Sequence, residues 1–138
     1  MAQISNEEFR LLVLRYFDFL INEHSYIYKE IGERKCTLES PLTKISIFIE
    51  YTTVVVGIEP IGEEAKKLLR ENILPEQLSI IVVSKCLNPG VDYKIIWDNP
   101  IDIELERRSK LLKEYCPDFV NGDFSKWISV IECLKKVK

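Results

Sequence analysis

The sequence has one histidine and lacks the short motifs with which many nucleotide-binding and metal-binding enzymes hold their ligands. It contains no G-x-x-x-x-G-K-S/T loop, no G-x-G-x-x-G segment after a strand, no H-E-x-x-H pair and no D-x-D-x-D-G calcium loop. The histidine, His24, stands just past the predicted end of the first helix, where the helix dipole favours an imidazolium ion. A Ser-His-Asp or Cys-His site would need this residue as its base. We therefore expect a structural role for His24, and we predict no catalytic residues, no cofactor and no bound metal.

The cysteines form no C-x-x-C pair, so zinc knuckles and thioredoxin-like redox sites lack their signature. The four of them, far apart along the chain, are Cys36, Cys86, Cys116 and Cys133. Free cysteine packs as a small hydrophobic residue, and disulfides are rare in the cytosol. We predict four buried, reduced thiols.

Targeting and membrane signals are also missing. Residues 1–5 lack the basic and apolar regions of a secretory signal, and no apolar run approaches the roughly 18 residues that span a bilayer. These absences predict a cytoplasmic protein with no membrane partner.

Basic blocks are absent as well. The formal net charge is −3, the sequence pI is near 5.3, and charges of both signs are interspersed along the chain. Nucleic-acid binders usually carry a basic face, because neutralising phosphates supplies most of their affinity. We expect no nucleic-acid partner.

The chain does have enough apolar residues for one core. It has 138 residues, of which 46% are hydrophobic and 30% charged, and it has no internal repeat, low-complexity tract or linker. Length and composition therefore predict a single domain over residues 1–138.

The first half reads as one helix followed by strands. Ser5 and Glu8 fit a capping box, and apolar residues then recur at helical spacing, which predicts a helix over about residues 6–23. Alternation with a period of two predicts strands at residues 44–51 and 54–59, and shorter ones at 26–31 and 36–39.

The second half is mostly helical, with two ambiguous segments. Residues 63–70 read as a short helix. Residues 75–87 favour a strand by propensity, although Pro75 could equally open a helix. Residues 93–97 read as a short strand.

Two helices are predicted at the C-terminal end. Asp102 is the expected cap of a helix over about residues 103–115. Asp123 or Ser125 is the expected cap of a last helix, after a tight turn in which Gly122 takes a positive φ and Asp123 bonds a backbone amide. The resulting fold class is α+β, an antiparallel sheet of about five to six strands packed with an N-terminal helix and C-terminal helices.

Acidic residues are the main candidates for chemistry. The stretch Asp98, Asp102, Glu104 and Glu106 could hold a magnesium ion or serve a glycosidase, but a capping aspartate and a solvated first helical turn explain it more simply. A small enzyme would need a pocket that joins two or more of Glu50, Glu59, Asp98 and Asp123.

A partner surface is the other candidate. Trp127 falls on an apolar helix stripe and is assigned to the core. Trp97 ends a predicted strand before Asn99 and Pro100, which force an extended exit. We predict a partner-binding surface of Trp97, Asp98 and Asp102; the alternative is that Trp97 turns inward and both aspartates only cap.

The segment Gly122-Asp123-Phe124-x-x-Trp127 is similar to the L-L-x-G-D-F/L-x-x-W/F ending of several small bacterial immunity proteins, which protect cells from polymorphic toxins. The helix segment 16–20 and the strand pair in residues 45–58 add to the resemblance. It implies a non-catalytic, protein-binding inhibitor whose partner is a toxin. The alternatives are a small enzyme with a carboxylate pair and a subunit of a structural homo-oligomer.

Overall fold

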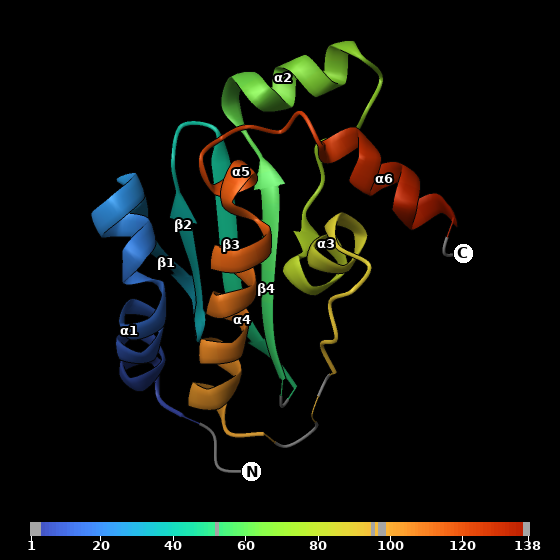
Figure 1. Cartoon of the computed structure of the whole chain (residues 1–138). Helices are drawn as coiled ribbons and strands as arrows, with labels where there is room; N and C mark the ends of the chain where they lie inside the picture. Colours follow the sequence, from blue (N-terminus) through green and yellow to red (C-terminus); the bar gives the residue numbers. More distant parts are fainter. Residues whose placement is uncertain (1–3, 52, 95, 97–98, 137–138) are drawn as a thin grey trace.

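The computed structural model describes residues 4–51, 53–94, 96 and 99–136. Figure 1 shows an α+β architecture in which one antiparallel sheet is packed with helices. The elements in chain order are α1 (Asn6–His24), β1 (Ile27–Gly32), β2 (Lys35–Glu39), β3 (Thr43–Glu50), β4 (Thr53–Pro60), α2 (Gly62–Arg70), β5 (Leu78–Ser79), α3 (Ile80–Leu87), α4 (Ile101–Tyr115), α5 (Pro117–Val120) and α6 (Trp127–Lys136).

Helix α1 begins at the predicted capping box. The Glu8 amide donates to Ser5 Oγ at 3.1 Å, and the Ser5 amide donates to Glu8 Oε1 at 3.3 Å. The helix ends where Ser25 takes a left-handed conformation with φ 59°. The sequence prediction of this helix is confirmed.

The sheet has five strands in the order β1-β2-β3-β4-β5, and every neighbouring pair is antiparallel. Cys36, Ile47 and Val56 lie in register across β2, β3 and β4, and all three are buried. Because alternate side chains of a strand point to opposite faces, this register places one apolar layer on a single face of the sheet. The predicted fold class and the four long strands are confirmed.

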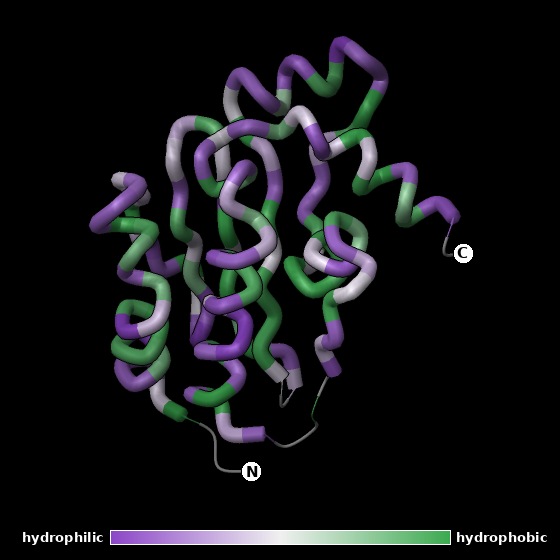
Figure 2. Tube along the Cα trace, viewed as in Figure 1, coloured by the Kyte–Doolittle hydropathy of each residue, from purple (hydrophilic) through white to green (hydrophobic). Residues whose placement is uncertain are grey.

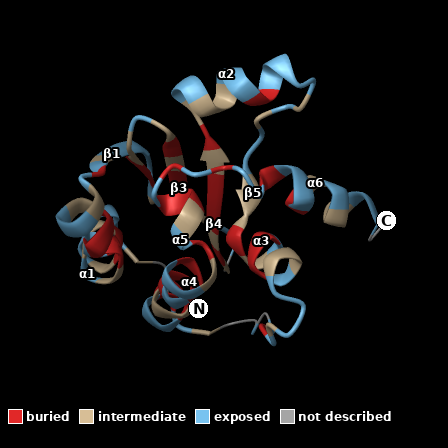
Figure 3. Cartoon of the chain, turned by 45° about the horizontal axis from the view of Figure 1, so that its top comes forward, coloured by how far each residue is buried: buried red, intermediate tan, exposed pale blue. Residues whose placement is uncertain are grey.

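That apolar layer is covered by helices. Figure 1 shows α1, α4 and α3 next to one another across one face of the sheet, with α2 at the top. In Figure 2, β3 and β4 are largely hydrophobic while α2 is mainly hydrophilic. Figure 3 shows the buried residues gathered in β3 and β4 and on the inward sides of the helices. None of the helices in the described residues has a stretch long and apolar enough to cross a bilayer.

The strand prediction for residues 75–87 is wrong. Only Leu78 and Ser79 form a strand, and α3 follows at once. Ser79 accepts a hydrogen bond from the Ile81 amide at 3.2 Å, which caps the helix. Ile80, Val83 and Ser84 are buried at helical spacing. Packing of this face and the serine cap therefore override the strand propensity of the β-branched run.

Two predictions for the segment before α4 also need correction. Tyr93, Lys94 and Ile96 have no strand structure, while positions 95 and 97 lie outside the described residues. Asp102 does not cap α4, because the helix begins at Ile101 with Pro100 in the N-cap position. The extended backbone of Pro100 starts the helix without a side-chain cap, and Asp102 lies exposed in the first turn, where the helix dipole favours a carboxylate.

Candidate functional site

The predicted partner surface falls only partly within the described residues. Trp97 and Asp98 lie outside them, and Asp102 is exposed on the first turn of α4. Two apolar side chains near it in sequence are unusually exposed, Ile96 at 50% and Ile103 at 43%. Exposed apolar side chains are candidates for the centre of an interface, and a carboxylate beside them for its polar rim.

A third exposed side chain lies at the same end of the molecule. Figure 1 shows the turn between β3 and β4 at the end where the chain enters α4. Tyr51, in this turn, is 92% exposed and has φ 58°, a conformation that costs energy for a residue with a side chain. We refer to Tyr51, Ile96, Asp102 and Ile103 as the loop surface.

Buried charges hold the chain that leads into α4. Glu104 Oε1 accepts from Arg108 Nη1 at 2.6 Å, and Glu104 Oε2 accepts from Arg107 Nη1 at 2.5 Å and from Asn99 Nδ2 at 2.8 Å. Glu104 and Arg108 are each only 2% exposed. Burial opposes ionisation of Glu104, but hydrogen bonds from Arg108, Asn99 and Arg107 outweigh it and lower the pKa of its carboxyl.

Arg107 and Arg108 also bind Tyr93 and Lys94, which precede α4 in the chain. Arg108 Nη1 donates to the Tyr93 hydroxyl at 3.0 Å, and Arg107 Nη2 donates to the Lys94 carbonyl at 2.7 Å. The Arg107 guanidinium lies 4.3 Å from the centre of the Tyr93 ring, within cation-π distance. Tyr93, Lys94 and Asn99 are therefore each held against α4.

Sequence reasoning missed this network and assigned Glu104 to a solvated turn. The one available signal was the i, i+4 spacing of Glu104 and Arg108, which places the two side chains next to each other on a helix. That spacing is common on exposed helix faces, so it does not indicate burial. Nothing in the sequence indicates that Tyr93 and Asn99 bind Arg108 and Glu104.

Glu50 and Glu59, two of the carboxylates proposed for an enzyme, lie far apart. Glu50 pairs with Thr53 at one end of β4, whereas Glu59 lies near the other end and forms an ion pair with Lys44 at 3.9 Å. Six residues of strand, about 20 Å, separate these ends. Asp123 is exposed, and Asp98 lies outside the described residues. The described members of the set therefore give no geometric support to a carboxylate pair.

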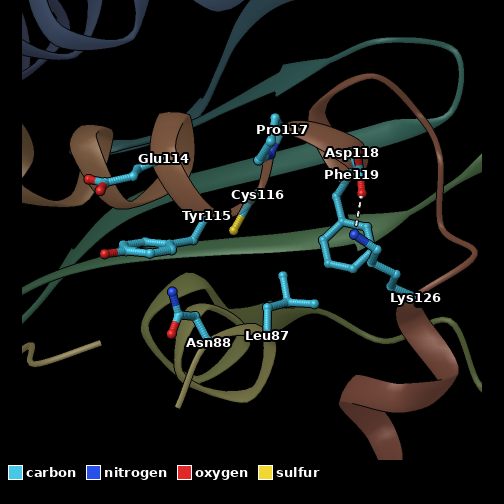
Figure 4. Close-up of a pocket in the computed structure, with 9 residues that line it drawn as sticks. All are labelled: Leu87, Asn88, Glu114, Tyr115, Cys116, Pro117, Asp118, Phe119 and Lys126. Carbon is cyan, nitrogen blue, oxygen red and sulfur yellow. Dashed lines mark ion pairs between the residues drawn. The ribbon is translucent and has the colours of Figure 1, made fainter. Parts of the chain in front are cut away.

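A cavity of about 420 Å³ lies between the end of α3, the end of α4 and α5. Figure 4 shows Leu87 and Asn88 on one side and residues 114–119 on the other, with an ion pair at the rim between Lys126 and Asp118. The two charged atoms of this pair are 2.9 Å apart. Cys116 lines the cavity, and burial raises the pKa of its thiol to about 11. The thiol is therefore protonated at neutral pH and is a poor nucleophile.

His24 packs as a structural residue. Its ring meets those of Phe19 and Tyr26 edge-on, with centroids 6.4 Å apart in each case.

The C-terminal motif is structural at each described contact. Gly122 has φ +84°, and a Cβ atom there would come within 2.8 Å of Leu42 Cδ1. Asp123 Oδ1 accepts from the Ser125 amide at 3.0 Å, as predicted. Because α6 begins only at Trp127, Asp123 stabilises the turn before the helix and does not cap it. Phe119, Phe124 and Trp127 pack with ring centroids 5.1–5.3 Å apart.

The prediction of four reduced cysteines is wrong for one pair. Cys86 and Cys133 form a disulfide, with their Cα atoms 5.9 Å apart. Cys36 and Cys116 are free and buried, as expected. Sequence separation misled the prediction, because α3 and α6 lie against each other although 47 positions separate the two cysteines.

No group of three or more His, Cys, Asp or Glu residues within the described part of the chain is placed to hold a metal ion.

Comparison of the chain with protein families, curated proteins and solved structures finds no match.

Proposed function

We propose that this protein is a non-catalytic domain that binds a protein partner through the loop surface. The observation that carries the proposal is the attachment of Tyr93, Lys94 and Asn99 to α4 by charged side chains that are buried or half-buried. Arg107, Arg108 and Glu104 hold Tyr93, Lys94 and Asn99 in place beside α4.

Such a network adds little net stability, because burying charged groups has a large desolvation cost. Removing the Glu104 carboxylate and the Arg108 guanidinium from water costs much of what their attraction returns. Holding Tyr93, Lys94 and Asn99 in place does have a benefit for binding, because the entropy of ordering these residues is not lost when a partner docks. The loop surface then offers apolar area at Tyr51, Ile96 and Ile103, with Asp102 able to steer a basic partner.

The form of this function that the Gly122-Asp123-Phe124-x-x-Trp127 resemblance favours is an immunity-type inhibitor of a bacterial toxin. An inhibitor of this kind binds over its target and catalyses no reaction. Asp102, the carboxylate of the loop surface, favours a target whose matching surface is basic.

The test is affinity capture from a lysate of the source organism, followed by binding measurements with the captured partner and single variants. We expect Ile103→Lys to weaken binding at least about tenfold without lowering the melting temperature, because an exposed apolar contact is lost. Leu69→Lys, on α2 at the other end of the molecule, is the matched control, since Leu69 is 52% exposed.

Trp97→Ala and Asp98→Lys extend the test to the two predicted residues outside the described part. Unchanged binding in all three loop variants, or a loss with Leu69→Lys alone, would show that the partner binds elsewhere.

A further inference from the structure

Strand β1 is an edge of the sheet with one side open. It pairs with β2, and no second strand pairs with it among the described residues. Every residue of β1 except Tyr28 is exposed. An edge of this kind offers unpaired backbone donors and acceptors to any extended chain that can lie beside it.

The register shows which side chains flank those backbone groups. Tyr28 and Glu30 lie opposite the buried Leu38 and Cys36, so they point to the helix-covered face. Ile27 and Lys29 therefore point to the other face of the sheet. Ile27 is 72% exposed, and Lys29 has no ion-pair partner among the described residues.

A second copy of the chain fits this edge poorly. Symmetric antiparallel pairing within the flat part of β1 never places a carboxylate opposite Lys29. Centred on Tyr28, it places Lys29 opposite Ile27; centred on Lys29, it opposes two lysines; and centred on Glu30, it opposes two glutamates. Like charges in directly opposite positions destabilise a sheet. The bulge between Glu30 and Gly32 further limits the flat stretch to about four residues.

We propose that β1 is a docking edge for an extended segment of a protein partner, which adds to the sheet as a sixth strand. The segment has a carboxylate opposite Lys29 and an apolar side chain opposite Ile27. Backbone hydrogen bonds supply affinity, and these two side chains select the partner. The edge lies apart from the loop surface, so the proposal stands or falls independently of it.

The probe is a capped peptide, Val-Thr-Glu-Thr-Val, whose side-chain order is the same in either direction. Its counterpart, Val-Thr-Lys-Thr-Val, reverses the central charge. In NMR titrations we expect the Glu peptide to shift the amide signals of residues 27–32 and to bind roughly five- to tenfold more tightly than the Lys peptide.

Lys29→Glu should reverse this preference, because the charge opposite the peptide is then reversed. Lys110→Glu on α4 makes the same change in net charge at another exposed position and should leave the preference as it is. Either of two results would overturn the proposal: no shift of β1 amides with either peptide, or a preference that survives Lys29→Glu. Sedimentation showing a wild-type dimer with protected β1 amides would assign the edge to a second copy and also overturn it.

Discussion

Glu104 is a buried carboxylate held by two guanidinium groups and an amide, and its removal leaves those groups without their acceptor. Replacing it by Gln keeps the shape and removes the charge. Arg108 then stays buried without an opposite charge, so we expect Glu104→Gln to lower the free energy of unfolding by about 3–5 kcal/mol. Chemical denaturation measures the change. Glu106→Gln, two positions along the same helix and less buried, is the control and should have little effect.

The same residue makes stability depend on pH. The pKa of Glu104 is lowered in the folded state, so its contribution is complete above the ordinary glutamate pKa of about 4.3 and is lost as the pH falls through the folded value. Acid should therefore narrow the difference between wild type and Glu104→Gln. A difference that is the same at neutral and acidic pH would show that the carboxylate does not ionise preferentially in the fold.

Single residues show where sequence reasoning succeeds. Gly122 and Asp123 were predictable because a turn chemistry of glycine followed by aspartate acts between neighbours in the chain. Tyr93 and Arg108 were not, because their contact spans 15 positions and depends on how a loop returns to a helix. Hydrogen bonds between neighbours in the chain can be predicted from the sequence, whereas those between distant residues require knowledge of the fold.

At the scale of elements, α1 and the strands β1 to β4 follow from period and caps, whereas α3 does not. Its run Ile80-Ile81-Val82-Val83 has a high strand propensity, and a two-residue strand directly precedes it. The decisive factor is the surface that receives it: α3 packs on α4 and α6, and a helix buries Ile80 and Val83 there. Propensity is a weak guide when tertiary packing opposes it.

The disulfide between α3 and α6 gives an element-scale prediction. A bridge between Cys86 and Cys133 restricts the unfolded chain, and for a loop of 47 positions the entropy model gives about 3–4 kcal/mol of stabilisation. We expect reductant to lower the melting temperature of the oxidised wild type. The Cys86→Ser, Cys133→Ser double variant should melt at the lower temperature with or without reductant.

Mass spectrometry of the purified, unreduced protein supplies the independent check. An alkylating agent under denaturing conditions should label Cys36 and Cys116 only. Labelling of all four cysteines would restore the original prediction of reduced thiols.

For the whole molecule, the class of fold was predictable because helices and strands occur in blocks: one helix, consecutive strands, then helices. The assembly of the loop surface at one end of the molecule could not be predicted from the sequence. Tyr51 and Ile103 are distant in sequence and come to one end only because of strand directions and the placement of α4 (Figure 1).

The prediction of a single domain can be tested on contacts that join the two halves of the chain. The Tyr26 hydroxyl donates to the Val120 carbonyl at 2.7 Å, and Thr43 Oγ1 donates to the Phe119 carbonyl at 2.6 Å; both bonds are buried. Losing either half would leave these acceptors without partners, which is costly in a core. The sheet and the C-terminal helices should therefore unfold together.

Trp127 reports on the C-terminal part, because it is fully buried in α6 and one of only two tryptophans. In a Trp97→Phe variant it is the only indole, so its fluorescence follows α6 while far-UV circular dichroism follows the whole chain. We expect the two signals to give the same urea midpoint in the presence of reductant, which removes the disulfide as the tie between α3 and α6. A fluorescence transition at lower urea would identify α6 as a separately unfolding unit, joined to the rest mainly by the bridge from Cys86 to Cys133.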